Sequence, residues 1–150
     1  MRCVLGLNHP ATLRTWIVLA NASNAAGDPV TAERYAREAL HAAEATVERP
    51  AAIRRSATIA LAESLERQGG VAEAETLIQR ALLDFGGLQG GARIANSQLA
   101  IALAALRARD GRTGQARNDL LPVAEALLQQ LGPEHPVTRS AMGLLRDLNP

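Results

Sequence analysis

Residues 19–40 read LANASNAAGDPVTAERYAREAL, and the same pattern returns at residues 61–82 and 103–124. A leucine–alanine pair opens each copy at positions 19, 61 and 103, and a glycine follows at positions 27, 69 and 111. An alanine occupies positions 32, 74 and 116. Because all three series keep a spacing of 42 residues, the sequence predicts an internal repeat of that length.

A second motif extends the repeat toward both ends of the chain. The pattern Leu-Gly-x-x-His-Pro-x-Thr begins at Leu5 and begins again at Leu131, 126 residues later, which is three periods of 42. We therefore expect residues 1–8 to be the end of a truncated preceding repeat. Repeats are expected at 9–50, 51–92 and 93–134, with a capping helix at 135–150, and all of these segments should form one domain.

Each repeat is predicted to contain two helices joined by a tight turn. The first helix of the first repeat is expected to bury one face, formed by Trp16, Leu19, Ala20 and Ser23. Gly27 would end this helix, since glycine adopts positive φ at little cost. Asp28 and Pro29 would then cap and begin the second helix.

The composition supports an all-helical core. Hydrophobic residues make up 47% of the chain but aromatic residues only 2%, so the core must consist mainly of aliphatic residues, with alanine and leucine dominant. Both lose little on entering a helix. We predict an all-α fold, an α-solenoid of three helix-turn-helix repeats plus a C-terminal capping helix, with seven helices and no sheet. Pro122 is expected to kink the second helix of the third repeat. Met142 and Leu145 are expected to face inward.

This arrangement resembles the tetratricopeptide repeat (TPR), and in particular the kinesin-light-chain variety, whose repeat is 42 residues long. The Leu-Gly-x-x-His-Pro-x-Thr motif is similar to the junction of that variety. The junctions at residues 49–52 and 90–93 depart from it, and Ser23 and Arg107 stand where the family has large residues. The resemblance implies a non-catalytic scaffold that binds a partner peptide or helix in the concave groove lined by the first helices.

The candidate partner-binding residues lie on the first helices, opposite the expected buried stripe. They are Arg14, Ile17, Asn21 and Asn24 in the first repeat, Ser56, Ile59, Glu63, Glu66 and Arg67 in the second, and Gln98, Ile101 and Arg109 in the third. The isoleucines are again 42 residues apart. They either form an apolar strip in the groove or complete the packing between repeats, and the sequence leaves both open. The mixed charges disfavour a clamp for a carboxylate terminus, which would need several converging basic residues.

The composition disfavours several other classes of function. Sixteen basic and 15 acidic residues are spread along the chain, and no basic stripe marks a nucleic-acid surface. No apolar run approaches the roughly 20 residues that cross a membrane, and no secretory signal stands at the N-terminus, so a cytoplasmic location is expected. The only cysteine, Cys3, excludes an internal disulfide and a cysteine-based metal site.

No catalytic, cofactor-binding or metal site is expected. His9 and His135 precede prolines at predicted helix starts, which indicates a structural role. The glycine cluster at 86–91 lacks the Lys-Ser/Thr ending of a phosphate-binding loop and falls at a repeat junction, which favours an inter-repeat loop. We predict a protein or peptide partner and leave self-association open. The alternative is a C-terminal regulatory repeat module of a larger bacterial signalling protein, such as a kinase or a transcription regulator.

Overall fold

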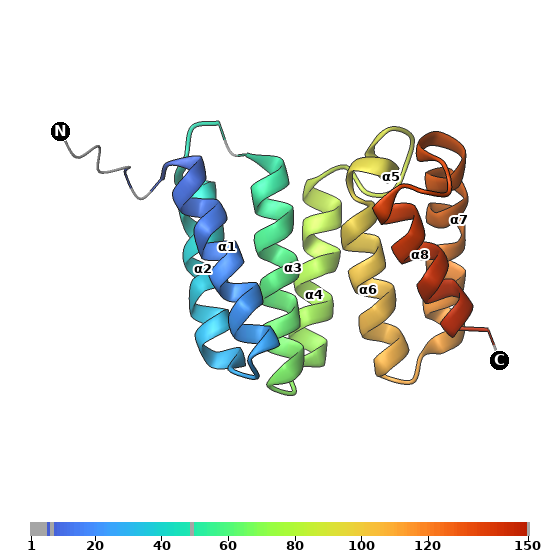
Figure 1. Ribbon diagram of the computed structural model, residues 1–150, viewed down its shortest axis with the longest axis horizontal. Coiled ribbons are helices and arrows are strands. Elements are labelled where there is room, and N and C mark those ends of the chain that lie inside the picture. Colours follow the sequence, from blue (N-terminus) through green and yellow to red (C-terminus); the bar gives the residue numbers. More distant parts are fainter. Residues whose placement is uncertain (1–5, 7, 49, 150) are drawn as a thin grey trace. The chain divides into compact units, whose positions relative to one another are not determined.

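The computed structural model describes residues 6, 8–48 and 50–149, and within these ranges the chain forms helices and no strand (Figure 1). The helices are α1 (Pro10–Ala25), α2 (Pro29–Ala45), α3 (Ala51–Arg67), α4 (Val71–Asp84), α5 (Ala92–Ala95), α6 (Ser97–Arg109), α7 (Thr113–Leu131) and α8 (Pro136–Asp147). The all-α prediction is confirmed, but these residues form eight helices and not seven. The additional helix is α5, a single turn. Features predicted for residues 1–5, Cys3 and Leu5 among them, lie outside the described residues.

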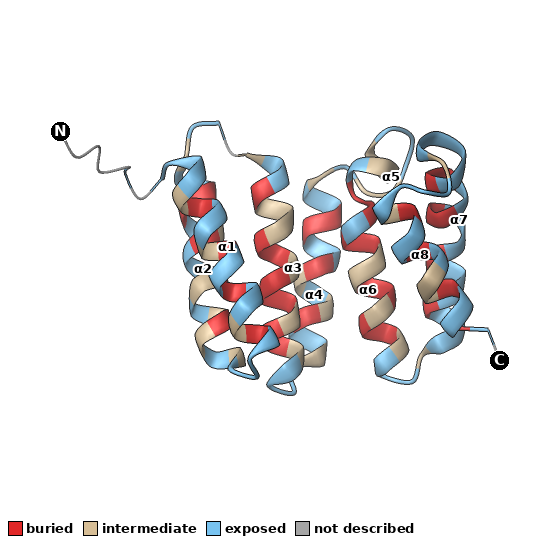
Figure 2. Cartoon of the chain, in the orientation of Figure 1, coloured by how far each residue is buried: buried red, intermediate tan, exposed pale blue. Residues whose placement is uncertain are grey.

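The chain divides into two compact units, Met1–Leu77 and Ile78–Pro150, and α4 spans the boundary. In the N-terminal unit, each of the helices α1, α2 and α3 contacts the other two. Leu13 and Ile17 of α1, Ala39 of α2 and Ala57 of α3 belong to one buried cluster. Small side chains on α2 and α3 let the helices approach closely, and Figure 2 shows the buried residues along the faces on which they pack.

In the C-terminal unit, α6 contacts α7, and α8 contacts both. Leu120 and Leu127 of α7 share a core cluster with Leu145 of α8. Helix α7 continues through Pro122 to Leu131.

Leu145, which belongs to this core cluster, faces inward as predicted, but Met142 is 41% exposed. The reason is that α8 buries a stripe three and four residues apart, at positions 138, 141 and 145, and position 142 lies beside it.

The turn inside each helical hairpin repeats with the same geometry. Gly27, Gly69 and Gly111 have φ angles of 82°, 87° and 83°. Each glycine donates its N–H to the carbonyl three residues earlier, and the following residue donates to the carbonyl five residues before itself, over 2.8–3.1 Å. This pair of bonds is the Schellman closure of a helix C-terminus, which requires the left-handed conformation that glycine adopts without strain. The predicted role of Gly27 is confirmed.

Three helices begin at a capping side chain followed by proline. The Asp28 carboxylate accepts the N–H of Thr31 at 3.1 Å, and Pro29 is the first residue of α2, as predicted. His9 and His135 act in the same way at α1 and α8, where Nδ1 accepts the N–H two residues later at 3.1 and 3.3 Å. Both histidines therefore have the structural role that the sequence indicated.

The buried stripe of α1 differs from the predicted one. Ala20 is buried, but Trp16 and Ser23 are half-buried and Leu19 is 39% exposed. The buried residues of α1 are Leu13, Ile17, Ala20 and Asn24. This stripe faces the core that α1 shares with α2 and α3, whereas the predicted stripe lies partly on a side of α1 that stays open to solvent.

The first helix of the third repeat is interrupted at Asn96. This interruption divides it into α5 and α6 and explains the additional helix. The Asn96 side chain is buried, and its Nδ2 donates to the carbonyls of Phe85 at 3.0 Å and Gly87 at 2.8 Å. Arg93 Nε donates to the Leu88 carbonyl at 3.0 Å. These bonds tie the glycine-rich loop between α4 and α5 to the start of α6, so the chain completes one turn at α5 before the longer helix begins.

Candidate protein-interaction surface

On α1, the candidate surface consists of exposed side chains spaced four and three residues apart. Arg14 and Asn21, both predicted, are exposed. Val18 lies between them and is 64% exposed, although it was not among the predicted residues. Residues with this spacing share one helix face. The signal that could have identified Val18 is therefore its position between two predicted residues.

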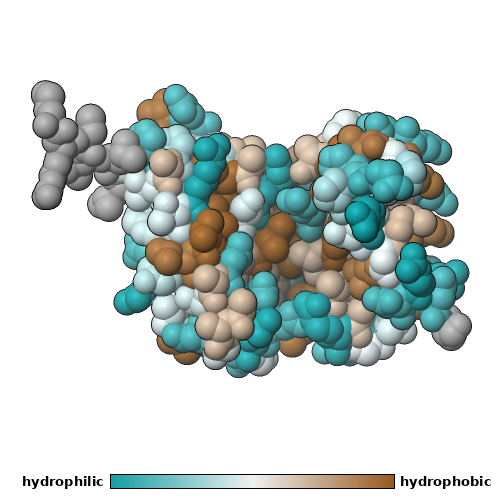
Figure 3. Space-filling model, in the orientation of Figure 1, coloured by the Kyte–Doolittle hydropathy of each residue, from teal (hydrophilic) through white to brown (hydrophobic). Residues whose placement is uncertain are grey.

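On α3, the predicted residues lie along the matching face. Ser56, Ile59, Glu63 and Glu66 are half-buried and Arg67 is exposed. Glu63 and Arg67 form an ion pair of 3.1 Å, one helical turn apart, with side chains 40% and 46% exposed. Such a pair contributes at most about 1 kcal/mol to folding, because water screens it. Figure 3 shows hydrophobic and hydrophilic residues mixed over α1 and α3 on this side.

In the C-terminal unit, the predicted residues lie on α6. Gln98 and Arg109 are exposed, and Ile101 is half-buried and packs against the core cluster of that unit. Gln98 occupies the repeat position of Arg14 and Ser56, so all three first helices carry an accessible polar side chain there.

Two of the predicted surface residues are buried, which corrects their placement. Ile17 belongs to the core cluster of the N-terminal unit. Asn24 is also buried, and its Nδ2 donates to the Ala60 carbonyl at 3.2 Å, which links α1 to α3. Of the two alternatives for the isoleucines, packing therefore holds for Ile17 and Ile101. Ile59 remains half-buried on the accessible face.

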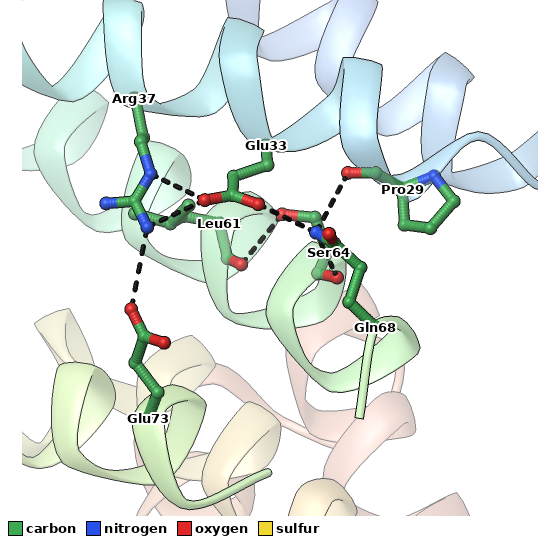
Figure 4. Close-up of polar contacts among 7 residues, drawn as sticks. All are labelled: Pro29, Glu33, Arg37, Leu61, Ser64, Gln68 and Glu73. Carbon is green, nitrogen blue, oxygen red and sulfur yellow. Dashed lines mark hydrogen bonds and ion pairs between the residues drawn. The ribbon is translucent and has the colours of Figure 1, made fainter. Parts of the chain in front are cut away.

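A polar network joins α2, the end of α3 and the start of α4 (Figure 4). Arg37 pairs with Glu33 at 2.7 Å and with Glu73 at 3.5 Å. Gln68 Nε2 donates to Glu33 Oε2 at 2.7 Å and to the Ser64 carbonyl at 3.2 Å. The sequence alone did not predict this network. Glu33 and Arg37 form a helical i,i+4 pair, but their partners Gln68 and Glu73 lie 35 and 36 residues later and are placed only by the fold.

The network holds Glu33 in its ionised form. The hydrogen bond from Gln68, followed by that from Arg37, lowers the pKa of Glu33 below its ordinary value of 4.5, while partial burial opposes the shift. A carboxyl group held ionised in this way is suited to joining helices and not to donating a proton near neutral pH.

Arg107 replaces an aliphatic residue inside the C-terminal unit. It occupies the repeat position of Leu65 and is buried. Its guanidinium pairs with the carboxylate of Asp119 on α7. A charged residue at this core position is therefore neutralised by the neighbouring helix.

The described ranges contain no group of three or more His, Cys, Asp or Glu side chains that could hold a metal ion. Within the same ranges, no helix combines the length and the apolar character needed to span a membrane.

Paired helices, repeated glycine closures and a 42-residue period define a TPR-like helical repeat fold, an α-solenoid. The chain matches no protein-family model and no curated protein sequence. Among solved structures it is similar to a crystal structure described as a kinesin light chain of Podosopora anserina with nearly identical TPR-like repeats. The TM-score is 0.67 and the identity 20%, over 97% of this chain and 68% of that chain. The likeness confirms the predicted fold.

Proposed function

We propose that this chain is a non-catalytic scaffold that binds a protein partner, as an extended peptide or a helix, along the exposed face of its first helices. TPR-like repeat folds generally serve as protein-interaction scaffolds. The observation that carries the proposal is that α1, α3 and α6 keep an accessible polar side chain at one shared repeat position, that of Arg14, Ser56 and Gln98, while their other sides form the cores.

We expect these accessible side chains to contribute little to the stability of the fold. Asn21 and Arg14 are exposed, and the Glu63–Arg67 pair is open to water. Removing an exposed side chain usually changes stability by no more than about 0.5 kcal/mol. Such residues are therefore free to be used for recognition.

The chemistry of the face indicates the kind of partner. Val18 and Ile59 offer apolar contact, and Asn21 can bond to both groups of a peptide main chain. Glu63 and Arg67 carry opposite charges, so the face favours neither a strongly acidic nor a strongly basic segment. Arg67 is the expected hot spot, since arginine combines a planar donor fork with a surface that stacks.

Affinity capture from the native cell with a surface variant tests the proposal. Asn21, Glu63, Arg67 and Arg109 are replaced together by alanine. The matched control replaces the exposed second-helix residues Glu38, Glu44, Arg80 and Arg117 by alanine. We expect both variants to melt like the native chain, but only the first-helix variant to lose the captured partner. Normal melting with unchanged recovery of the same partners by the first-helix variant would show that another surface binds.

A further inference from the structure

Three positions on α1 are exposed although their counterparts in every later first helix are buried. They are Thr15, Leu19 and Ala22. One, two and three periods later, the counterparts are Ala57, Leu61 and Ser64 at α3, Leu99, Leu103 and Leu106 at α6, and Ala141, Leu145 and Leu148 at α8. All nine are buried. We call the side of α1 formed by Thr15, Leu19 and Ala22 the open α1 face.

The later copies show what kind of element covers this position. In the N-terminal unit, Ala57 of α3 shares its cluster with Ala39 of α2. In the C-terminal unit, Leu145 of α8 shares its cluster with Leu127 of α7, and Thr138 Oγ1 donates to the Leu127 carbonyl at 3.4 Å. In both units the covering helix is the second helix of the preceding hairpin. The side chains that this second helix adds to the cluster are those of alanine, valine and leucine.

The composition of α1 matches that kind of partner. Residues 15–27 include no charged side chain. On the open α1 face, Leu19 and Ala22 are exposed, and Trp16, three residues before Leu19, is half-buried. An uncharged surface with exposed aliphatic side chains gains from burial against an apolar helix and offers nothing to an ionic partner.

We propose that the open α1 face is a docking surface for the second helix of another TPR-like hairpin, an amphipathic helix with an uncharged stripe of alanine, valine and leucine. The last helix of this chain is not such a partner. Arg139 and Arg146 of α8 are exposed at the repeat positions of Leu13 and Ala20, so head-to-tail stacking of two copies would place arginines against an apolar face. The open α1 face lies beside the face proposed for partner binding and does not include Arg14, Val18 or Asn21.

The test adds a helix of the stated kind to the chain. Residues 1–5 are replaced by an extra copy of residues 93–131, so that Gly6 follows Leu131 of the copy as Gly132 does at its own position. Trp16 is the only tryptophan, and residues 93–131 contain none, so tryptophan fluorescence reports on α1 alone. We expect the emission of Trp16 to move to shorter wavelength, acrylamide quenching to fall and the thermal midpoint to rise. The short tether supplies a high local concentration, so docking does not depend on affinity in solution.

A matched fusion carries Val123→Asp and Leu127→Asp in the added copy only, and its Trp16 should keep the emission and quenching of the native chain. As a second readout, Leu19→Ala should lower the midpoint of the fused chain more than that of the native chain. Identical fluorescence and quenching in the fusion, its aspartate control and the native chain would overturn the proposal. A native dimer in sedimentation that Leu19→Glu converts to monomer would also overturn it, because a second copy would then cover the face.

Discussion

Leu19 and Leu145 occupy the same repeat position 126 residues apart, yet Leu19 is 39% exposed on α1 and Leu145 is 9% exposed on α8. The leucines between them, Leu61 and Leu103, are 2% and 7% exposed. Identical side chains at one repeat position thus differ in burial according to what covers each helix. In a repeat protein, where stability is a sum of local and nearest-neighbour terms, they should also differ in their contribution to stability.

Leu61→Ala should lower the free energy of unfolding by about 2–5 kcal/mol, the range for truncating a buried leucine. Leu19→Ala is the matched control, with the same residue type at the same repeat position, and should cost less than about 1 kcal/mol because the side chain is already partly in water. Urea denaturation of both variants measures the difference. Equal losses would mean that the open α1 face is covered in solution.

Asp119→Ala removes the carboxylate that pairs with the buried Arg107 and should destabilise the chain by about 1–3 kcal/mol. Arg107→Leu should cost less than Arg107→Ala, since Leu65 fills the same repeat position with an aliphatic side chain. Thermal melts of the three variants provide the comparison. If Arg107→Leu were the most destabilising of them, the ion pair would be essential and not merely a tolerated substitute for packing.

The Glu33 network should make stability depend on pH in the acid range. The folded state lowers the pKa of Glu33, so the ionised carboxylate stabilises the fold above its ordinary pKa of 4.5, and this contribution is lost as pH falls through the lower folded value. Glu33→Gln should therefore flatten the loss of stability below about pH 4.5. Glu38→Gln, on the exposed side of α2, is the matched control. If the stability of Glu33→Gln fell with decreasing pH as steeply as that of the native chain, the network would be excluded as the source of this pH dependence.

Gly69→Ala should destabilise the chain by about 1–2 kcal/mol, because φ at this turn is 87°, a left-handed conformation that an L-residue with a Cβ adopts only under strain. Gly143→Ala should instead stabilise it by about 0.5–1 kcal/mol, since Gly143 lies within α8 and an added Cβ meets nothing within 4 Å. Midpoints of chemical denaturation measure both. A Gly69→Ala variant at least as stable as the native chain would contradict the turn geometry.

The 42-residue period was enough to predict helices, hairpins and turns. Gly27, Gly69 and Gly111 mark the turns because a helix closure with positive φ selects glycine, and that selection is visible in sequence. Asp28 and Pro29 mark a helix start for an equally local reason. Because single residue types determine local conformations of this kind, the fold class could be predicted from the sequence alone.

Features that depend on two distant segments could not be predicted in this way. The helical period indicates that one face of α1 is buried. It does not indicate which of two adjacent stripes of side chains forms that face, because this depends on where α2 and α3 pack. The sequence predicted Asn24 to be a polar surface residue. Its side chain is instead buried, because its hydrogen-bond partner, the Ala60 carbonyl, lies on the next hairpin. The break at Asn96 likewise depends on carbonyls that the preceding loop presents.

Binding through the first helices is tested most directly by site-specific photo-crosslinking in the native cell. A photoreactive amino acid is placed at Asn21 or Glu63 on the first helices, or at Glu38 or Arg80 on the second helices, one position per variant, and cross-linked proteins are identified by mass spectrometry. We predict that Asn21 and Glu63 cross-link to the same protein and that Glu38 and Arg80 do not. Cross-links to that protein from Glu38 or Arg80, with none from Asn21 or Glu63, would contradict the proposed binding face.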